Sequence, residues 1–382
     1  MKKVCFVTTV SLTVRAFFIP ILAYLKENTD WDLTVICDED PSLEKVLPEG
    51  VRYYPVPMKR GISLSAFRAT MQMRRFFARE KFDLVQYSTP NAALYGAVAA
   101  KLARVPHRKY HLMGFRFLGF TGMKKWLFKT IEKISCALST DVECVSASNL
   151  KLGIEQKVFK KEKGSVLFHG STSGVDLQRF DINRKQLWRT QLRQAFGYHE
   201  AECVFGFAGR ITGDKGINEL LEAFQKMKAP NTRLVLVGME EETHTLNPEL
   251  LQWAKEAPNV TFHGFVDDIE KYFAMMDVLV LPSYREGFGN IVIESQAMGV
   301  PVIISDIPGP TDAMCPGVTG LVVPVKNAVA LQGAMESLLA DKNKREAMGM
   351  EGYRYVQSCF DQKKLCREIL NDRQKLLEVR EK

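Results

Sequence analysis

The sequence lacks an apolar run of the roughly 20 residues that a membrane-spanning helix requires. Its longest candidate, residues 92–100, is about half that length. The N-terminal Met-Lys-Lys leads directly into a strand-like segment, without the long apolar region and small-residue cleavage site of a signal peptide. From these absences we expect a cytoplasmic protein.

Paired cysteines are also absent. The eight cysteines include no Cys-x-x-Cys pair and no zinc-ligand spacing, and they are scattered singly beside apolar neighbours. This pattern predicts reduced core residues and offers no metal site.

Acidic residues are scarce in the first half of the chain. Residues 1–170 contain 27 Lys and Arg against 15 Asp and Glu, whereas residues 171–382 contain 25 against 29. Such an asymmetry concerns partners rather than fold. Because the sequence has no helix-turn-helix, RNP-type or zinc signature, we expect no nucleic-acid partner. An anionic membrane surface and a phosphate-bearing acceptor both fit the basic half.

Short apolar strands alternate with helical patterns along the whole chain. This alternation predicts an α/β architecture with parallel, doubly wound sheets. The pattern restarts after residue 200, which indicates two consecutive Rossmann-like units split between residues 165 and 200. The predicted strands lie at residues 4–8, 33–37, 84–87, 107–112, 142–145, 204–208, 234–237, 260–263, 278–281, 302–304 and 320–323.

The most informative segment is Glu286-Gly-Phe-Gly-Asn-Ile-Val-Ile-Glu294. It follows a strand-like run and leads into a helix, so a glycine turn precedes a helix N-terminus. Backbone N–H groups at such a terminus favour an anion. Two carboxylates beside an anion predict a ligand that also carries hydroxyl groups, as a nucleotide sugar does.

Two basic residues follow an earlier strand. Arg210 and Lys215 lie in the loop after residues 204–208, at the edge where open α/β sheets bind ligands. The planar fork of an arginine and the mobile charge of a lysine together suit a diphosphate. The alternative is a surface loop whose arginine pairs with a nearby acid.

Together these motifs resemble the C-terminal half of a retaining GT-B glycosyltransferase of family GT4. The two glutamates with seven residues between them match, as do the Gly-Arg…Lys-Gly segment, the Gly-x-Val-x-Asp turn after residue 263 and the Gly-x-Thr-Gly-Leu stretch at 317–321. The segment from His169 to Phe180 is similar to an interdomain segment of bacterial polysaccharide transferases, with Ser173 where asparagine is usual. The resemblance covers most of the chain and is strongest over residues 166–325.

The resemblance implies two Rossmann-like domains facing a cleft, with a C-terminal helix that crosses back to the N-terminal domain. It predicts an acceptor-binding domain at residues 1–168, a nucleotide-sugar-binding domain at 169–355 and the returning helix at 356–382.

The resemblance also implies roles for individual residues. Arg210 and Lys215 would neutralise the departing diphosphate and Glu286 would hold the transferred sugar, so these three are the catalytic candidates. Glu294 would accept hydrogen bonds from the ribose. The other donor-binding candidates are Gly209, Gly264, Phe265, Val266, Gly287, Phe288, Gly289, Asn290 and Ile291.

The implied reaction moves a hexose or N-acetylhexosamine from a nucleoside diphosphate sugar, UDP-linked, to a lipid-linked glycan. Capsule, O-antigen and exopolysaccharide synthesis at the inner face of the cytoplasmic membrane are the expected settings. No metal or cofactor is expected, because Arg210 and Lys215 face the diphosphate. The alternatives are a GDP-sugar-dependent mannosyl transferase, a UDP-sugar epimerase and a non-catalytic subunit of the same fold.

The first half departs from the family pattern. Family members often carry a histidine before a glycine at the end of an N-domain strand, where this sequence has Met113 before Gly114. His111 lies two residues upstream and would share a face with Met113. Both are therefore acceptor-side candidates, and a half-buried strand histidine is the alternative. In either case the departing phosphate can deprotonate the acceptor.

Two arginines complete the acceptor-side candidates. Arg15 follows the first strand, in a loop without the family's usual glycine pair, and would contact an acceptor phosphate or remain solvated. Arg116 belongs to the aromatic and basic segment 114–129, whose composition suits a membrane interface. Within and just after this segment, residues 123, 126, 127, 130, 131 and 134 have helical spacing and are predicted to face the core.

Asp38-Glu-Asp40 spells the Asp-x-Asp metal motif of the other large glycosyltransferase fold. It follows the second predicted strand, far in sequence from the donor motifs, so we interpret it as a surface loop.

Overall fold

The computed structural model describes residues 1–58 and 64–378, and in it the chain divides into two compact units. Unit 1 comprises residues 1–173 together with residues 363 onwards, and unit 2 comprises residues 174–362. The predicted borders, after residues 168 and 355, precede these by five and seven residues. The second difference arises because one helix runs to Cys359 and packs within unit 2.

Unit 1 is built on a seven-stranded parallel sheet in the order β3-β2-β1-β4-β5-β6-β7. The reversal of strand order between β1 and β4 marks its topological switch point. The strands are β1 (Lys3–Val7), β2 (Asp32–Cys37), β3 (Arg52–Pro55), β4 (Leu84–Ser88), β5 (His107–Leu112), β6 (Asp141–Cys144) and β7 (Gly164–Ser165).

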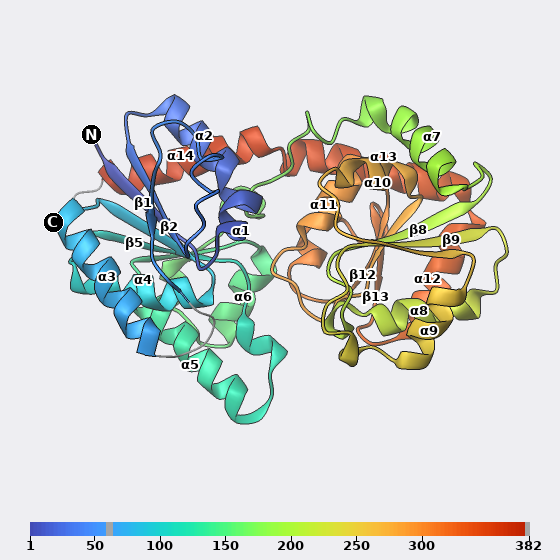
Figure 1. Ribbon diagram of the computed structural model, residues 1–382, viewed down its shortest axis with the longest axis horizontal. Helices are drawn as coiled ribbons and strands as arrows, with labels where there is room; N and C mark the ends of the chain where they lie inside the picture. Colours follow the sequence, from blue (N-terminus) through green and yellow to red (C-terminus); the bar gives the residue numbers. More distant parts are fainter. Residues whose placement is uncertain (59–63, 379–382) are drawn as a thin grey trace. The chain divides into compact units, whose positions relative to one another are not determined.

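Helices cover both faces of this sheet (Figure 1). Side chains of β1 alternate between them: Cys5 and Val7 pack towards α3 and α4, and Val4 and Phe6 pack towards α2 and α14. The helices of unit 1 are α1 (Ser11–Thr13), η1 (Val14–Phe18), α2 (Ile19–Asn28), α3 (Leu64–Glu80), α4 (Pro90–Leu102), η2 (Arg116–Gly119), α5 (Gly122–Leu138), α6 (Ala147–Glu155), η3 (Lys161–Lys163) and α14 (Gln362–Glu378).

Unit 2 repeats the plan with a six-stranded parallel sheet in the order β10-β9-β8-β11-β12-β13. Its switch point lies between β8 and β11. The strands are β8 (Cys203–Ala208), β9 (Thr232–Val237), β10 (Val260–His263), β11 (Val278–Leu281), β12 (Val302–Ser305) and β13 (Gly320–Val323). All eleven strands predicted from the sequence are confirmed, and β3 and β7 are additional.

The helices of unit 2 form two packed groups, one of α7, α10, α11 and α13 and the other of α8, α9 and α12 (Figure 1). Both faces of the sheet are therefore buried, as a parallel sheet requires. The helices are η4 (Ile182–Arg184), α7 (Lys185–Phe196), η5 (Gly213–Lys215), α8 (Ile217–Met227), η6 (Thr243–Thr245), α9 (Pro248–Glu256), α10 (Ile269–Met275), α11 (Asn290–Ala297), η7 (Pro310–Asp312), α12 (Ala328–Ala340) and α13 (Lys342–Cys359).

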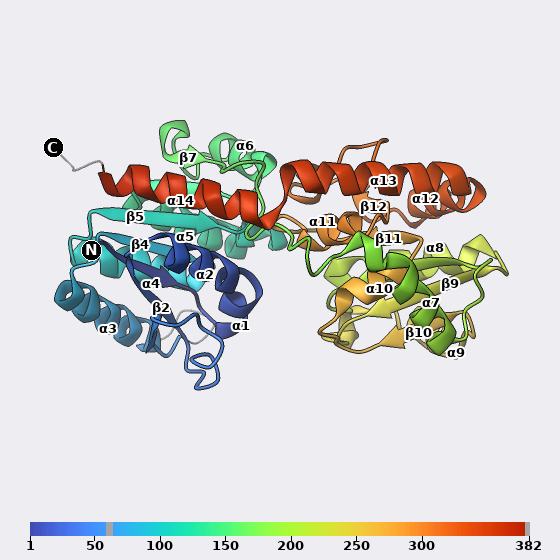
Figure 2. The same cartoon turned by 90° about the horizontal axis from the view of Figure 1, so that it is seen from above.

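The C-terminal helix α14 returns to unit 1, where it lies along β4 and β5 (Figure 2). A buried ionic network holds it there. Arg373 donates to Glu143 Oε2 at 2.6 Å and to Gln86 Oε1 at 2.7 Å, while Lys109 Nζ lies 2.8 Å from Asp372 Oδ2. Burial opposes ionisation of Glu143, but Arg373 and Lys109 outweigh it and hold its pKa well below the usual range. The packing of α14 on the sheet thus pairs these buried charges.

Helix α5 corrects one prediction from the sequence. The residues of α5 that are predicted to face the core are largely exposed. Met123, Trp126, Leu127 and Ile134 are 84%, 67%, 40% and 44% exposed. The buried face consists instead of Glu132, Ser135 and Cys136. The prediction was wrong because a buried acid, which accepts a hydrogen bond from Tyr110 at 2.6 Å, takes a core position that apolar spacing assigns to other residues.

Candidate active site

The loops that follow β8 and β11 meet at the switch point of unit 2. Lys215, at the end of η5, lies after β8, and Glu286 lies after β11; Lys215 Nζ is 2.6 Å from Glu286 Oε1. Both side chains are about five-sixths buried, at 16% and 17% exposure. Two residues 71 positions apart, predicted separately as diphosphate and sugar ligands, therefore form one ion pair.

Close backbone approach makes this meeting of loops feasible. Gly216 has φ of +72°, and a Cβ there would lie 2.1 Å from the Pro282 carbonyl oxygen. A side chain at position 216 would push the two loops apart. Tyr284 N–H also donates to the carbonyl of Asp214 at 2.9 Å, which ties the β11 loop to η5. The positions of Lys215 and Glu286 are thus set by main-chain contacts.

The glycine turn before α11 packs in a similar way. Gly289 is the N-cap of α11, so the N–H groups of Asn290 and Ile291 lie in its first turn. A Cβ at Gly309 would lie 2.4 Å from the carbonyl oxygen of Gly287. The loop after β12 therefore supports the turn 287–289 by backbone contact, and it leaves no room for a side chain at 309.

Glu294 lies one turn into α11 and is partly buried. Burial raises its pKa to about 7; the nearby Arg179 acts in the opposite direction and Glu270 adds to the rise. Among the described residues, no hydrogen bond to the Glu294 carboxyl group is present. A poorly solvated carboxyl group of this kind gains from a ligand that donates hydrogen bonds.

Arg179 and Glu270 are site residues that sequence reasoning missed. Arg179 Nε donates to Glu270 Oε2 at 2.9 Å, and the pair influences Glu294 electrostatically. Arg179 falls inside the family-like segment from His169 to Phe180, which was the available signal. Nothing in the sequence around Glu270 distinguishes it from an ordinary helical acid.

Arg210 is placed differently from Lys215. It is half exposed and its Nη1 lies 3.3 Å from Glu241 Oε2, in the loop after β9. Although burial raises the pKa of Asp214, a hydrogen bond from Thr212 and the charges of Arg285, Lys215 and Arg210 lower it, so Arg210 lies near the η5 loop. The pairing with a nearby acid is the alternative that the sequence left open, and the structure does not bring Arg210 into the Lys215–Glu286 pair.

The turn after β10 is open. A Cβ added at Gly264 would meet no atom within 4 Å, and Phe265 is 68% exposed. His263 Nε2 lies 3.0 Å from the Tyr272 hydroxyl, which fixes the start of this turn. The main chain at Gly264, Phe265 and Val266 is therefore accessible to a ligand.

The acceptor-side candidate Arg15 is paired with residues of its own unit. Arg15 Nη2 lies 3.1 Å from Asp40 Oδ2 and 2.7 Å from Ser42 Oγ. Hydrogen bonds from Ser42 and Ser11, together with Arg15, hold the pKa of Asp40 well below its usual range. The Asp-x-Asp segment is thus part of a loop network in which Asp40 pairs with a basic residue.

His111 is buried on β5. Its Nδ1 lies 3.2 Å from Ser88 Oγ, and its ring makes an edge contact with Phe18 at 5.8 Å between centroids. Burial lowers its pKa to about 4, although Glu143 acts in the opposite direction. This geometry favours the strand-histidine interpretation over an acceptor contact.

Met113 and Arg116 follow β5 and are partly exposed. The Arg116 guanidinium lies over the ring of Phe128, 4.4 Å from its centroid, in the direction of α5. Arg116 also lines a cavity between α4 and α5, whereas Met113 does not.

Comparisons with known proteins show the fold and the family of the chain. HepE from Anabaena, in a crystal structure with UDP and glucose, superposes with a TM-score of 0.80 and 20% identity over 98% of this chain and 100% of that one. The model "Glycosyl transferase 4-like" matches residues 3–146 and "Glycosyl transferases group 1" matches residues 189–355. The capsular polysaccharide biosynthesis glycosyltransferase CapM of Staphylococcus aureus is 30% identical over 374 residues, 96% of each chain.

The chain belongs to the GT4-type GT-B glycosyltransferases. A further relative of this glycosyltransferase is the UDP-Gal:alpha-D-GlcNAc-diphosphoundecaprenol alpha-1,3-galactosyltransferase of Escherichia coli, which is 27% identical over 294 residues, 75% of this chain and 74% of that one. The two family matches fall in separate units, and the match in unit 2 includes Arg210, Lys215, Glu286 and Glu294.

Proposed function

We propose that this glycosyltransferase moves a hexose or N-acetylhexosamine, with retention of configuration, from a UDP-linked sugar to a lipid-linked glycan. Capsule, O-antigen or exopolysaccharide synthesis is its setting. The proposal rests on the 2.6 Å pairing of Lys215 with Glu286 beside the N-terminus of α11. The names of two relatives support it, one from capsular polysaccharide biosynthesis and one with a UDP-Gal donor and a diphosphoundecaprenol-linked acceptor.

In this proposal each loop of unit 2 holds one part of the donor. Lys215 and Arg210 neutralise the diphosphate, and the N–H groups of Asn290 and Ile291 bind its distal phosphate. Glu294 accepts hydrogen bonds from the ribose, and the main chain at Phe265 and Val266 contacts the base. Glu286, with Gly287, Phe288 and Gly289, holds the transferred sugar; Gly209 leaves room for the diphosphate.

In this proposal the transfer reaction requires no residues beyond those that bind the donor. The bond between the anomeric carbon and the diphosphate oxygen breaks, and the acceptor oxygen bonds to the same face of the sugar. The acceptor proton passes to the departing phosphate, so no protein base is required. Lys215 and Arg210 stabilise the charge that develops on the diphosphate, so we assign no role to a metal or a cofactor.

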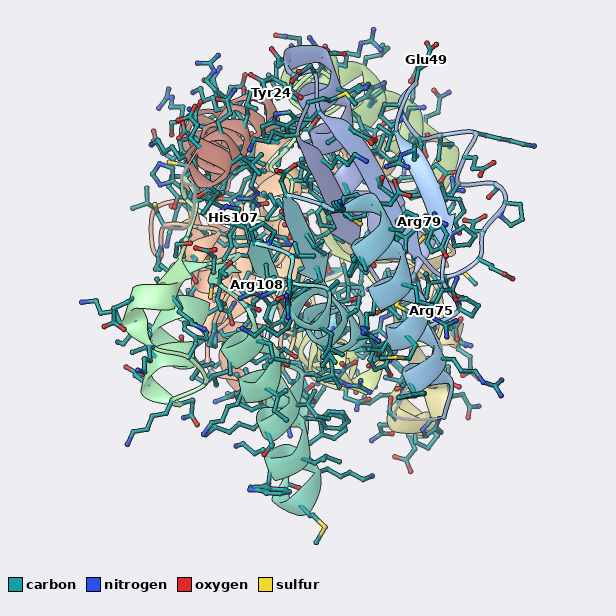
Figure 3. The ribbon with its side chains drawn as sticks, turned by 90° about the vertical axis from the view of Figure 1, so that its left-hand side faces the viewer. Tyr24, Glu49, Arg75, Arg79, His107 and Arg108 are labelled. Atoms are coloured by element: carbon teal, nitrogen blue, oxygen red, sulfur yellow. The ribbon has the colours of Figure 1, made fainter. Side chains whose placement is uncertain are left out.

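We further propose that the enzyme attaches peripherally to the anionic inner face of the cytoplasmic membrane through unit 1. The exposed apolar residues of α5 lie among exposed lysines 124, 125 and 133. On α3, a groove of about 640 Å³ is lined by Arg68, Arg75 and Arg79; Figure 3 shows the last two on the outer side of unit 1. No helix in the described part of the chain is long and apolar enough to cross a bilayer.

A thermal-shift panel tests donor choice. UDP-, GDP-, ADP- and dTDP-sugars are added to the full chain at equal concentration, and a specific binder raises the melting temperature by mass action. We expect the UDP-sugars to give the largest shift. A larger shift with GDP-sugars would identify a GDP-sugar as the donor in place of a UDP-sugar. No shift with any of the four would refute nucleotide-sugar transfer.

Substitutions at the Lys215–Glu286 pair test the assignment of roles. We expect Lys215→Ala to lower kcat by at least about 100-fold, because it removes charge stabilisation at the leaving group. We expect Glu286→Gln to lower transfer but to bind UDP at least as tightly, because Lys215 is freed from its partner. The matched control is Lys226→Ala, which breaks a surface Lys–Glu pair of the same 2.6 Å length on α8. Wild-type turnover in Lys215→Ala contradicts the assignment.

A further inference from the structure

A cavity of about 260 Å³ lies inside unit 1, between α4, η2 and α5. Its walls are mainly apolar, with a few polar groups among them. The lining residues that matter below are Leu94, Arg116, Leu127, Phe128, Ile131 and Glu132. None of them belongs to the donor loops of unit 2.

The cavity lies at the ligand-binding edge of the sheet. Pro90, which also lines it, starts α4 directly after β4, and Arg116 follows β5, so the cavity is next to the carboxyl ends of both strands. In open α/β sheets ligands bind at this edge, near the switch point. At the switch point itself the Thr9 and Thr89 hydroxyl groups are hydrogen-bonded, 2.7 Å apart, immediately before α4.

Two charged side chains, Arg116 and Glu132, line the cavity. Arg116 lies over the Phe128 ring, with its guanidinium 4.4 Å from the centroid. Glu132 is buried and accepts a hydrogen bond from the Tyr110 hydroxyl at 2.6 Å. Burial raises the pKa of Glu132 to about 7, against the influence of Tyr110 and Arg116. Glu132 is thus hydrogen-bonded within unit 1, and the positive charge of Arg116 suits an anionic ligand.

The cavity reaches the exposed face of α5. Leu127 lines the cavity and is also 40% exposed, and its neighbour Trp126 is 67% exposed. Apolar surface therefore continues from inside the cavity to the part of α5 that we propose to contact the membrane. This continuity suits a ligand whose hydrocarbon is anchored in a bilayer.

We propose that this cavity binds the head-proximal hydrocarbon of a polyprenyl diphosphate, with Arg116 contacting the diphosphate. The inference rests on the proposed lipid-linked acceptor and locates its lipid in unit 1. The combination of apolar walls and one guanidinium matches a ligand in which a phosphate adjoins a hydrocarbon chain. Because pockets for drug-sized ligands are larger, about 300–1,000 Å³, the cavity holds only the start of the chain and the remainder stays in the bilayer.

Calorimetric titration of the full chain tests the inference, with the proposed donor site of unit 2 saturated with UDP so that the probes report on unit 1. The probes are farnesyl diphosphate and inorganic diphosphate, which share the anionic head and differ in the hydrocarbon. We expect farnesyl diphosphate to bind at least about tenfold more tightly, because apolar surface is removed from water. Arg116→Gln should weaken binding of both probes.

Variants that fill the cavity separate it from the surface of α5. Ile131→Trp places a large ring in the cavity, and Leu94→Phe narrows it from α4, so each should remove the tenfold preference for farnesyl diphosphate. The matched control is Ile134→Trp, the same substitution one turn further along α5 at a position that is 44% exposed and does not line the cavity. The melting temperature of each variant reports whether it folds.

The outcomes distinguish this inference from the proposed function. Equal affinity of the wild-type chain for the two probes overturns the cavity assignment. A preference retained in both filling variants, or lost equally in Ile134→Trp, also overturns it. If UDP-sugars still stabilise the chain and transfer to a lipid-linked acceptor proceeds, the proposed function stands while the cavity assignment fails. Absence of any UDP-sugar binding removes the proposed function itself.

Discussion

At the scale of single residues, the environment of a carboxyl group separates the two glutamates of the motif. Glu286 is paired with Lys215 at 2.6 Å, whereas Glu294 is next to a pair formed by other residues, Arg179 and Glu270. Glu286 is thus one member of an ion pair, whereas the Glu294 carboxyl group accepts no hydrogen bond from the described residues. The spacing of the two glutamates in the sequence does not show this difference in environment.

The pKa of Glu294 predicts how UDP binding depends on pH. Since burial raises this pKa to about 7, the carboxyl group is largely neutral below pH 7 and ionised above it. An ionised carboxylate accepts hydrogen bonds from both ribose hydroxyls, so affinity for UDP should rise as the pH rises through 7. Isothermal titration at pH 6 and pH 8 should show a difference of up to about tenfold.

Glu294→Gln provides the control for this pH effect. Glutamine keeps the shape and one acceptor oxygen but does not titrate, so the variant should bind UDP with a flat profile over the same range. Phosphate ionisation of UDP affects both proteins equally and cancels in the comparison. An equal pH dependence in the variant would falsify the assignment of Glu294 to the ribose.

At the scale of secondary structure, prediction succeeded where a strand or loop is defined by its own sequence. Parallel strands buried on both faces are continuous apolar runs, and all eleven found this way are confirmed. The edge strand β3, Arg52-Tyr-Tyr-Pro55, is partly exposed, and β7 has two residues, so neither has such a run. The loop residues Lys215 and Glu286 were correctly assigned to one sheet edge, because parallel strands end at the same side.

Prediction failed where a polar residue occupies the core. Helix α5 was given the wrong face because Glu132 is buried with Tyr110, while Trp126 is exposed. His111 was an acceptor-side candidate with a half-buried strand histidine as the alternative; in the structure it is buried and its ring contacts Phe18 of η1, a contact that strand periodicity does not show. Nor does periodicity show that α14, from the far end of the chain, supplies the charges that pair with Lys109 and Glu143.

The buried network under α14 predicts a large loss of stability. Arg373→Met leaves Glu143 buried without its main partner, and breaking a buried ion pair in this way costs about 3–5 kcal/mol. Denaturant unfolding of the full chain should show this loss in the transition of unit 1. Lys375→Met, a charge removal at an exposed position on the same helix, should change stability by less than about 0.5 kcal/mol.

A double substitution distinguishes an unpaired charge from poor packing. In Arg373→Met with Glu143→Met, no buried acid remains, so the double variant should be more stable than Arg373→Met alone. The single variant Glu143→Met completes the comparison. If the stability losses of Arg373→Met and Glu143→Met simply add in the double variant, the cost of Arg373→Met comes from packing of the side chain, and the ionic network does not fix α14.

At the scale of the whole molecule, the charge asymmetry coincides with the division into units. The basic excess lies in residues 1–170, which form most of unit 1, and the exposed apolar part of α5 lies in the same unit. Unit 2 carries the donor loops and a slight acidic excess. Under the proposed function, the water-soluble donor therefore binds unit 2, and the surface proposed to contact anionic lipid belongs to unit 1.

This division predicts salt-dependent flotation with anionic liposomes. At about 10 mM salt, where the Debye length is about 30 Å, the protein should float with vesicles that contain anionic lipid, and it should be released near 1 M salt, where that length is about 3 Å. Met123→Ser with Trp126→Ser should reduce flotation at every salt concentration, because it removes apolar insertion. Leu187→Ser with Val329→Ser, which removes two exposed apolar residues of unit 2, should float like the wild type. Retention that does not change with salt contradicts an electrostatic anchor, and equal loss in both double variants contradicts attachment through unit 1.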